Sequence, residues 1–234
     1  MSEKLQLPSV TLFAADSIDA VGMIKVLEHC KSKIDFGAVV FLTHIPCDYE
    51  HKVKIPPLNS LIAYSIFMLT KAYQYINTSH FLTVQRDGWI LNPQSWDDNW
   101  LLNDYTAPLY QQYPKVGSGG FSLRTKRMME GIAKEEMPEW DWTDKQAHEI
   151  QQGVGMYEDG VCSLKNRNGK YKIATLEQGA NFAQGGCRDP KYYREYSFGF
   201  HRTHQAIRFD TGYIDSSDPT RDITQSYAKD IEAL

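Results

Sequence analysis

The sequence predicts an α/β fold with a mostly parallel central sheet and helices on both faces. Short apolar, β-branched runs at residues 10–15, 38–42 and 81–84 have the length and composition of buried strands. Residues 18–30 and 59–75 lie between these runs and carry their apolar side chains at helical spacing. Strands and helices that alternate in this order are typical of a parallel sheet covered by helices.

The residues that bound these segments support the assignment. Asp16 and Ser17 follow the first strand, and both are good N-caps for a helix that begins near residue 18. The second helix repeats apolar side chains at Ile62, Ile66 and Leu69. Each predicted helix is therefore placed between two predicted strands.

A polar turn follows the third predicted strand, in the sequence Q-R-D-G-W-I-L-N-P at residues 85–93. Side chains at the point where a buried strand leaves a parallel sheet lie at the edge where α/β proteins bind ligands. The Asp87 carboxylate is therefore a candidate ligand for a metal ion or a polyoxygenated molecule. The alternative is that Asp87 and Gly88 only form a turn, which is a common use of this dipeptide.

The second half of the chain contains a glycine-rich segment and a further predicted helix. A glycine-rich sequence, V-G-S-G-G-F-S-L-R, occupies residues 116–124, and we expect it to approach a ligand closely or to adopt positive φ. An ordinary hairpin turn is the alternative. Further along, Thr143 opens a sequence with capping-box spacing, which predicts another helix.

Composition excludes several classes of protein. With 234 residues and 42% hydrophobic content, the chain can bury a full core. A net charge of -4 and a pI near 6.0 give no general basic field for nucleic acid or anionic membrane. We expect no signal peptide and no transmembrane segment, because the longest apolar stretch, at residues 58–68, is short and interrupted. Four widely spaced cysteines indicate thiols in a reducing cytoplasm.

Common nucleotide and acyl-transfer motifs are absent from the sequence. No glycine-rich fingerprint follows the first strand, and there is no P-loop and no G-x-S-x-G elbow. What remains is an acid at a strand exit, a glycine-rich turn and the acidic pair Glu158-Asp159. This combination fits chemistry in which a diphosphate leaves and a hydroxyl attacks.

These features, taken in order along the chain, resemble a family of largely uncharacterised glycosyltransferase-like domains. That family typically shows Q-W-D-G-F-x-L-N-P, then V-G-N-G-G-F-S-L-R, then an E-D pair, and the resemblance spans roughly residues 10–201. It implies the GT-A fold, a Rossmann-like fold of nucleotide-diphospho-sugar transferases.

The resemblance also implies how the chain is organised. We expect a single GT-A-type domain at residues 1–210, with a nucleotide-sugar half at about 1–110 and an acceptor half at about 111–210. A C-terminal tail would follow at residues 211–234.

In GT-A enzymes a D-x-D motif at this strand exit holds a divalent cation on the donor diphosphate. The resemblance therefore implies Asp87 and His201 as metal ligands, and Mn²⁺ or Mg²⁺ as the cation. Gln85 replaces the first carboxylate of that motif, which puts the need for a metal in question. The leaving diphosphate could instead be neutralised by a basic side chain: Arg86, Lys115 or Arg202. His201 could also be a packing histidine.

The same resemblance implies the residues that bind the nucleotide sugar. Ala14, Asp16 and Thr43, at the ends of the first two strands, would hold the base and ribose. The remaining donor-binding residues would be Arg86, Asp87, Gly119 and Gly120. Trp89 or Trp96 would stack on a sugar face.

Asp159 is the candidate general base, because an acid near a helix N-terminus is held ionised by the helix dipole. Glu158 would orient the acceptor. The alternative is that this pair is an ordinary acidic start to a helix.

The resulting hypothesis is a glycosyltransferase that moves a sugar from a nucleoside-diphosphate sugar to a hydroxyl of a glycan or of a hydroxymethylated base in phage-type DNA. A DNA acceptor would need a local basic patch, for which the sequence offers Arg124, Lys126, Arg127, Lys165, Arg167, Lys170 and Lys172. The alternative from another class is a catalytically inactive GT-A-like module that binds sugar or acts as a scaffold.

Overall fold

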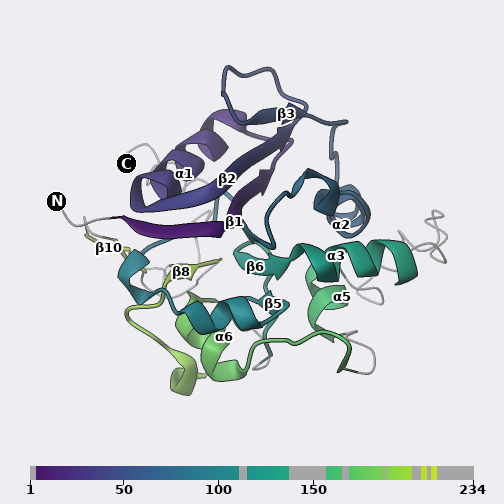
Figure 1. The fold of residues 1–234 in the computed structure, drawn as a ribbon. Helices are drawn as coiled ribbons and strands as arrows, with labels where there is room; N and C mark the ends of the chain where they lie inside the picture. Colours follow the sequence, from purple (N-terminus) through teal and green to yellow (C-terminus); the bar gives the residue numbers. More distant parts are fainter. Residues whose placement is uncertain are drawn as a thin grey trace.

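Figure 1 shows the fold of the protein in a computed structural model. The structure describes residues 4–110, 115–136, 157–164, 169–185, 187, 189–201, 207–209 and 212–214. The helix predicted to begin at Thr143 lies outside these residues, as do Lys165, Arg167 and Arg202.

A six-stranded sheet forms the centre of the fold, in the order β3-β2-β1-β4-β6-β5. Its strands are β1 (Leu5–Ala15), β2 (Ile34–Thr43), β3 (Lys52–Lys54), β4 (His80–Thr83), β5 (Tyr105–Thr106) and β6 (Ser122–Thr125). The first four neighbours are parallel, whereas β6 runs antiparallel to both β4 and β5. The predicted α/β fold with a mostly parallel sheet is confirmed.

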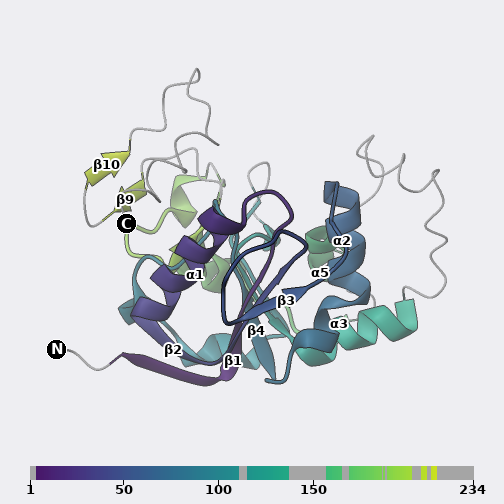
Figure 2. The ribbon, with the colours of Figure 1, turned by 90° about the horizontal axis from the view of Figure 1, so that it is seen from above.

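Helices cover both faces of this sheet, as Figure 2 shows: α1 packs on one face, and α2, α3 and α5 lie on the other. The helices are α1 (Ala20–Lys33), α2 (Leu61–Thr70), α3 (Lys126–Gly131), α5 (Glu158–Leu164) and α6 (Leu176–Phe182). In the described part of the chain, none of the helices is long and apolar enough to cross a membrane.

Short elements connect these units. The one-turn and π-helical segments are η1 (Ala72–Tyr75), η2 (Pro93–Ser95), η3 (Asp98–Leu102), η4 (Ile132–Glu136) and η6 (Pro190–Tyr192). Two further pairs of strands are β7 (Ala183–Gln184) with β8 (Gly199–Phe200), and β9 (Ile207–Phe209) with β10 (Gly212–Ile214). The β10 strand lies within the segment predicted as a tail.

Alternate residues of β1 serve two hydrophobic cores, because successive strand side chains point to opposite faces. Leu12 and Ala14 pack in the core on the α1 side. Phe13 and Ala15 pack in the core beneath α2 and α3. Both faces of the second half of β1 are thus buried, which explains why residues 12–15 are continuously apolar instead of alternating.

Predicted element boundaries differ from the observed ones where capping decides them. The first helix begins at Ala20 because the Asp19 side chain accepts a hydrogen bond from the Gly22 amide and caps it. Asp16 forms a separate turn before the helix, accepting from the amides of Ile18 and Asp19. Asp16 therefore stays at the end of β1, where a ligand could reach it.

Candidate functional site

The candidate site lies at the carboxyl edge of the sheet, between β1 and β4. The strand order reverses here, because β2 and β3 lie on one side of β1 while β4 lies on the other. Ligands of open α/β sheets bind outside the strand ends at such a switch point. Arg86, which follows β4, donates from Nε to Oδ2 of Asp16, which follows β1, at 3.0 Å. This ion pair ties the two strand ends together.

The turn after β4 presents Asp87 at this edge. Gln85 and Gly88 exchange two backbone hydrogen bonds of 3.0 Å each, so that Arg86 and Asp87 are the two central residues of the turn. Asp87 and Gly88 do belong to a turn, and the Asp87 side chain in it is 26% exposed. The same turn brings Asp87 Oδ1 to 3.6 Å from His201 Nε2.

The His201 imidazole is buried, and only one of its two ring nitrogens, Nδ1, has a hydrogen-bond partner. Its Nδ1 lies 2.6 Å from the Ser118 hydroxyl, and its backbone N–H donates to the Gln184 carbonyl of β7 at 2.9 Å. Its Nε2 is buried without a hydrogen-bond partner, and the residue is only 5% exposed. A buried, unpartnered ring nitrogen that faces a carboxylate is a feature that needs a functional explanation.

Close approach of side chains accounts for the glycines at residues 119 and 120. A Cβ on Gly120 would lie 2.1 Å from His201 Nε2 and 2.3 Å from Gln85 Oε1, and one on Gly119 would lie 2.5 Å from Glu158 Oε1. The expectation of positive φ here is wrong: among the glycines of the described residues, only Gly169 has it, at 64°. The absence of side chains, and not backbone freedom, is what this turn requires.

Glu158 is anchored inside the protein. Its Oε1 accepts from Arg124 Nη2 at 3.2 Å and its Oε2 accepts from the Ser65 hydroxyl at 3.2 Å. Arg124 has no exposed surface and also donates to the Gly119 carbonyl at 3.1 Å. Both oxygens of the Glu158 carboxylate are therefore engaged, and Arg124 links this carboxylate to the glycine turn at Gly119.

Asp159, the next residue, lies closer to the surface. Its Oδ1 accepts from the Gly160 amide at 2.7 Å, and its Oδ2 lies 3.4 Å from the Gly119 amide nitrogen. Burial, together with the negative charge of Glu158, raises the pKa of Asp159 to about 6. A carboxylate that titrates near neutrality suits a group that must both accept and release a proton.

Burial removes three of the predicted ligand contacts, and a fourth residue, Trp96, is partly buried against the core. Ala14 and Thr43 are fully buried, so their side chains belong to the core and offer no surface to a nucleotide. Trp89 is also fully buried, with its ring 4.4 Å from that of Phe200, and cannot stack on a sugar. Trp96 packs edge-on against Trp100, at 5.3 Å between ring centroids, within the same aromatic core.

The structure thus brings three predicted groups to one edge: Asp16 with Arg86, Asp87 with His201, and Asp159 beside Gly119. Lys115 is exposed at the start of the glycine-rich segment. Four contributors were missed from the sequence: Tyr64, Ser65, Ser118 and Arg124. Ser118 and Arg124 stand inside the V-G-S-G-G-F-S-L-R motif, so the motif itself was the available signal.

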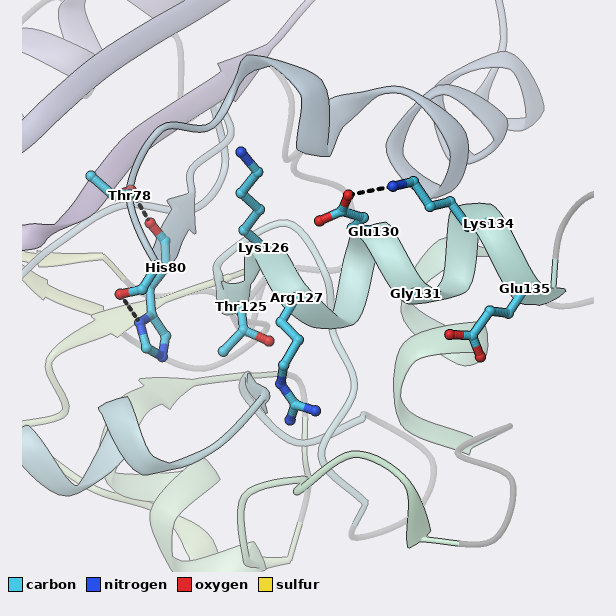
Figure 3. Close-up of a pocket in the computed structure, with 10 residues that line it drawn as sticks. Thr78, His80, Thr125, Lys126, Arg127, Glu130, Gly131, Lys134 and Glu135 are labelled. Carbon is cyan, nitrogen blue, oxygen red and sulfur yellow. Dashed lines mark hydrogen bonds and ion pairs between the residues drawn. The ribbon is translucent and has the colours of Figure 1, made fainter.

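Another hollow lies at the opposite edge of the sheet, and Figure 3 shows the side chains around it. It is formed by the start of β4 at His80 and by α3 with the residues around it. Its charges are largely paired within the protein: Glu130 accepts from Lys134 at 2.6 Å, and Arg127 pairs with Asp104. This hollow is separate from the carboxyl-edge site.

Fold and site together define an α/β domain with a candidate ligand-binding edge at the switch point of a mostly parallel sheet. The chain belongs to a protein family described as of unknown function, DUF5672, whose match covers residues 51–201. The matched region contains the turn after β4, the glycine turn, the acidic pair and His201.

Comparisons beyond the family are weak. No curated protein matches the chain. One similar solved structure is a glycosyltransferase involved in the glycosylation of the major capsid of PBCV-1, at 10% identity and a TM-score of 0.44, with 97% of this chain and 100% of that chain covered. A similarity this distant carries no argument about the present chain.

Proposed function

We propose that the protein is a glycosyltransferase that moves a sugar from a nucleoside-diphosphate sugar to an acceptor hydroxyl. The observation that carries the proposal is that the Gly119-Gly120 segment links the two acids at the switch point of the sheet. Asp159 Oδ2 lies 3.4 Å from the Gly119 amide nitrogen, and Gly120 packs against His201, whose Nε2 lies 3.6 Å from Asp87 Oδ1. In this proposal Asp87 serves the donor and Asp159 serves the acceptor.

On the donor side, Arg86 and Asp16 lie where a nucleotide diphosphate would enter. Arg86 is about one-third exposed and can turn from Asp16 to a phosphate oxygen, because a guanidinium matches both groups. A divalent cation, Mn²⁺ or Mg²⁺, fits the Asp87–His201 pair, since the buried Nε2 has no hydrogen-bond partner. When bound, that cation would offset the negative charge of the leaving diphosphate.

On the acceptor side, Asp159 serves as the general base. It takes the proton of the acceptor hydroxyl while the acceptor oxygen bonds to the anomeric carbon of the donor. The bond between that carbon and the diphosphate oxygen breaks, and the diphosphate leaves with the electron pair. The amide of Gly119, next to the Asp159 carboxylate, helps to fix its position.

We propose a glycan as the acceptor, in the bacterial or virus-infected cytoplasm. DNA is disfavoured because three of the seven basic residues proposed to contact it are buried or paired with an acid. Arg124 is fully buried, Arg127 pairs with Asp104, and Lys170 pairs with Glu135. Steep salt dependence of binding to duplex DNA would reverse this choice.

The test is turnover of nucleotide sugars by purified protein, with and without Mn²⁺ and with glycan acceptors. We expect release of the nucleoside diphosphate by the wild type, and its loss in both Asp87→Ala and Asp159→Ala with the fold intact. Asp35→Ala, at the opposite edge of the sheet, is the matched control and should retain activity. If no nucleotide sugar is bound or hydrolysed, the proposal fails; binding without turnover would instead favour the inactive sugar-binding module.

A further inference from the structure

We infer that the side-chain amide oxygen of Gln85 is a third protein ligand of the cation held by Asp87 and His201. The inference rests on the proposed function for the identity of the cation as divalent. It concerns the position at which this chain has an amide where a D-x-D motif has a carboxylate. The site would then consist of one carboxylate, one imidazole and one amide.

The packing around Gly120 is what points to Gln85. A Cβ at this position would lie 2.3 Å from Gln85 Oε1 and 2.1 Å from His201 Nε2. Both atoms therefore pack against Gly120 at the same point, and they lie close to each other because residue 120 has no side chain. Asp87 Oδ1 lies 3.6 Å from the same Nε2. Metal bonds to nitrogen and oxygen are each about 2 Å long, so one cation can contact both of these atoms.

The amide of Gln85 is oriented by a neighbour. Its Nε2 donates to the Tyr64 hydroxyl at 3.2 Å, which leaves Oε1 on the side of Gly120. Amide oxygens are ordinary ligands of hard cations. A ligand that is held by a second hydrogen bond loses less freedom when it binds a metal.

His201 is oriented in the same way. The Ser118 oxygen, 2.6 Å from Nδ1, can accept the Nδ1 proton and so leave the lone pair of Nε2 available. Nε2 is the ring nitrogen that is buried without a partner. Tyr64 and Ser118 are thus positioning residues for two ligands that converge on Gly120.

An amide in place of a carboxylate changes how the site should behave. The three protein groups carry a single negative charge, from Asp87, and the affinity of oxygen-ligand sites depends on how many charged ligands they have. We therefore expect weak binding of the free cation and tighter binding when a nucleoside diphosphate adds its own charge. The cation and the donor would bind cooperatively.

The experiment is a titration of the full-length protein with MnCl2, followed through the electron paramagnetic resonance signal of free Mn²⁺, without any nucleotide. The variants are Gln85→Glu, Gln85→Ala and Gly120→Ala. Gln74→Glu is the matched control, because the exposed Gln74 amide also donates to a tyrosine hydroxyl, that of Tyr73, and both residues lie in η1.

We expect Gln85→Glu to bind Mn²⁺ about tenfold more tightly than the wild type, and Gln85→Ala to bind about tenfold more weakly. Gly120→Ala should bind weakly because its Cβ would displace Gln85 Oε1 and His201 Nε2 from their positions, and Gln74→Glu should match the wild type. The gain in Gln85→Glu cannot arise from misfolding. Equal affinities of the wild type and both Gln85 variants, or no Mn²⁺ binding by the wild type, would overturn the inference.

These outcomes are separate from those that decide the proposed function. Gln85-dependent Mn²⁺ binding with no turnover of any nucleotide sugar would refute the transferase proposal and retain the metal site. Turnover that is unaffected by Mn²⁺ and by the Gln85 variants would support the transferase proposal and refute Gln85 as a metal ligand.

Discussion

Replacing Asp159 by Asn should stabilise the protein at neutral pH. Asp159 is held largely buried beside the negatively charged Glu158, and these surroundings raise its pKa from 3.8 to about 6. Asn keeps nearly the same shape and can still accept the Gly160 amide hydrogen bond, which is 2.7 Å long. What it removes is the cost of carrying a charge at this position.

The size of the effect follows from the difference between the two pKa values. The folded protein binds the Asp159 proton up to about pH 6, whereas the unfolded chain loses it near pH 4. Because the folded state binds more protons between these values, its free energy of unfolding falls as the pH rises from 4 to 6 and then stays lower. Two pKa units correspond to about 3 kcal/mol. The long bond to the Gly119 amide is lost in Asn, so we expect a net gain of about 2 kcal/mol at pH 7.5.

Urea unfolding at pH 7.5 and at pH 4.0 measures this difference. Asp159→Asn should have a higher unfolding midpoint than the wild type at pH 7.5 and nearly the same midpoint at pH 4.0. Asp35→Asn, an exposed acid at the start of β2, is the control and should change the free energy of unfolding by less than about 0.5 kcal/mol at either pH. If the unfolding midpoints of the wild type and Asp159→Asn differ by the same amount at both pH values, the electrostatic origin of the effect is refuted.

Three further predictions follow, two for the same site and one for the packing of β8. Arg124→Met leaves Glu158 as a buried charge without its cationic partner, and should lower the free energy of unfolding by about 3–5 kcal/mol in a urea titration; a loss under about 1 kcal/mol would contradict this role for Arg124. For the proposed glycosyl transfer, kcat/KM should rise with pH up to about 6 and then level off, as Asp159 loses its proton; a profile flat from pH 5 to 8 would remove Asp159 as the base. Gly199→Ala should destabilise the protein by about 1–3 kcal/mol in thermal unfolding, because its Cβ would lie 2.4 Å from the Phe121 ring; wild-type stability would show that β8 can move away.

The sequence predicts the features that depend only on residues close together in the chain. The alternation of strands and helices depends on short-range periodicity, and the structure has it. The position of Asp87 at the carboxyl edge of the sheet follows from a turn directly after an apolar strand, which needs no knowledge of distant residues. The local sequence indicates Asp16 as a helix cap, whereas the cap is Asp19, and a nucleotide contact by Asp16 is implied only by the family resemblance.

What the sequence could not supply depends on contacts between distant segments. Trp89 follows Asp87 by two residues, but β8 covers it with Phe200, which is more than a hundred positions away. The anchoring of Glu158 requires Ser65 from α2 and Arg124 from β6 to meet beneath the glycine turn. Charged residues such as Arg124 are expected at the surface. Its burial is made tolerable by hydrogen bonds from Nε to Ser122 and from Nη2 to Gly119 and Glu158.

The proposed function depends above all on a nucleoside-diphosphate sugar binding at the edge formed by Asp16, Arg86 and Asp87. Thermal unfolding with a panel of nucleotide sugars and Mn²⁺ tests this binding most directly, because a ligand that binds only the folded state stabilises it by about 2.7 kcal/mol at a hundred times its Kd. For a chain of this size, that corresponds to a rise in Tm of about 5–10 °C. We predict such a rise for at least one nucleotide sugar with the wild type and with Asp35→Ala, and its loss with Asp87→Ala. No rise with any donor, or an equal rise in Asp87→Ala, would contradict donor binding at this edge.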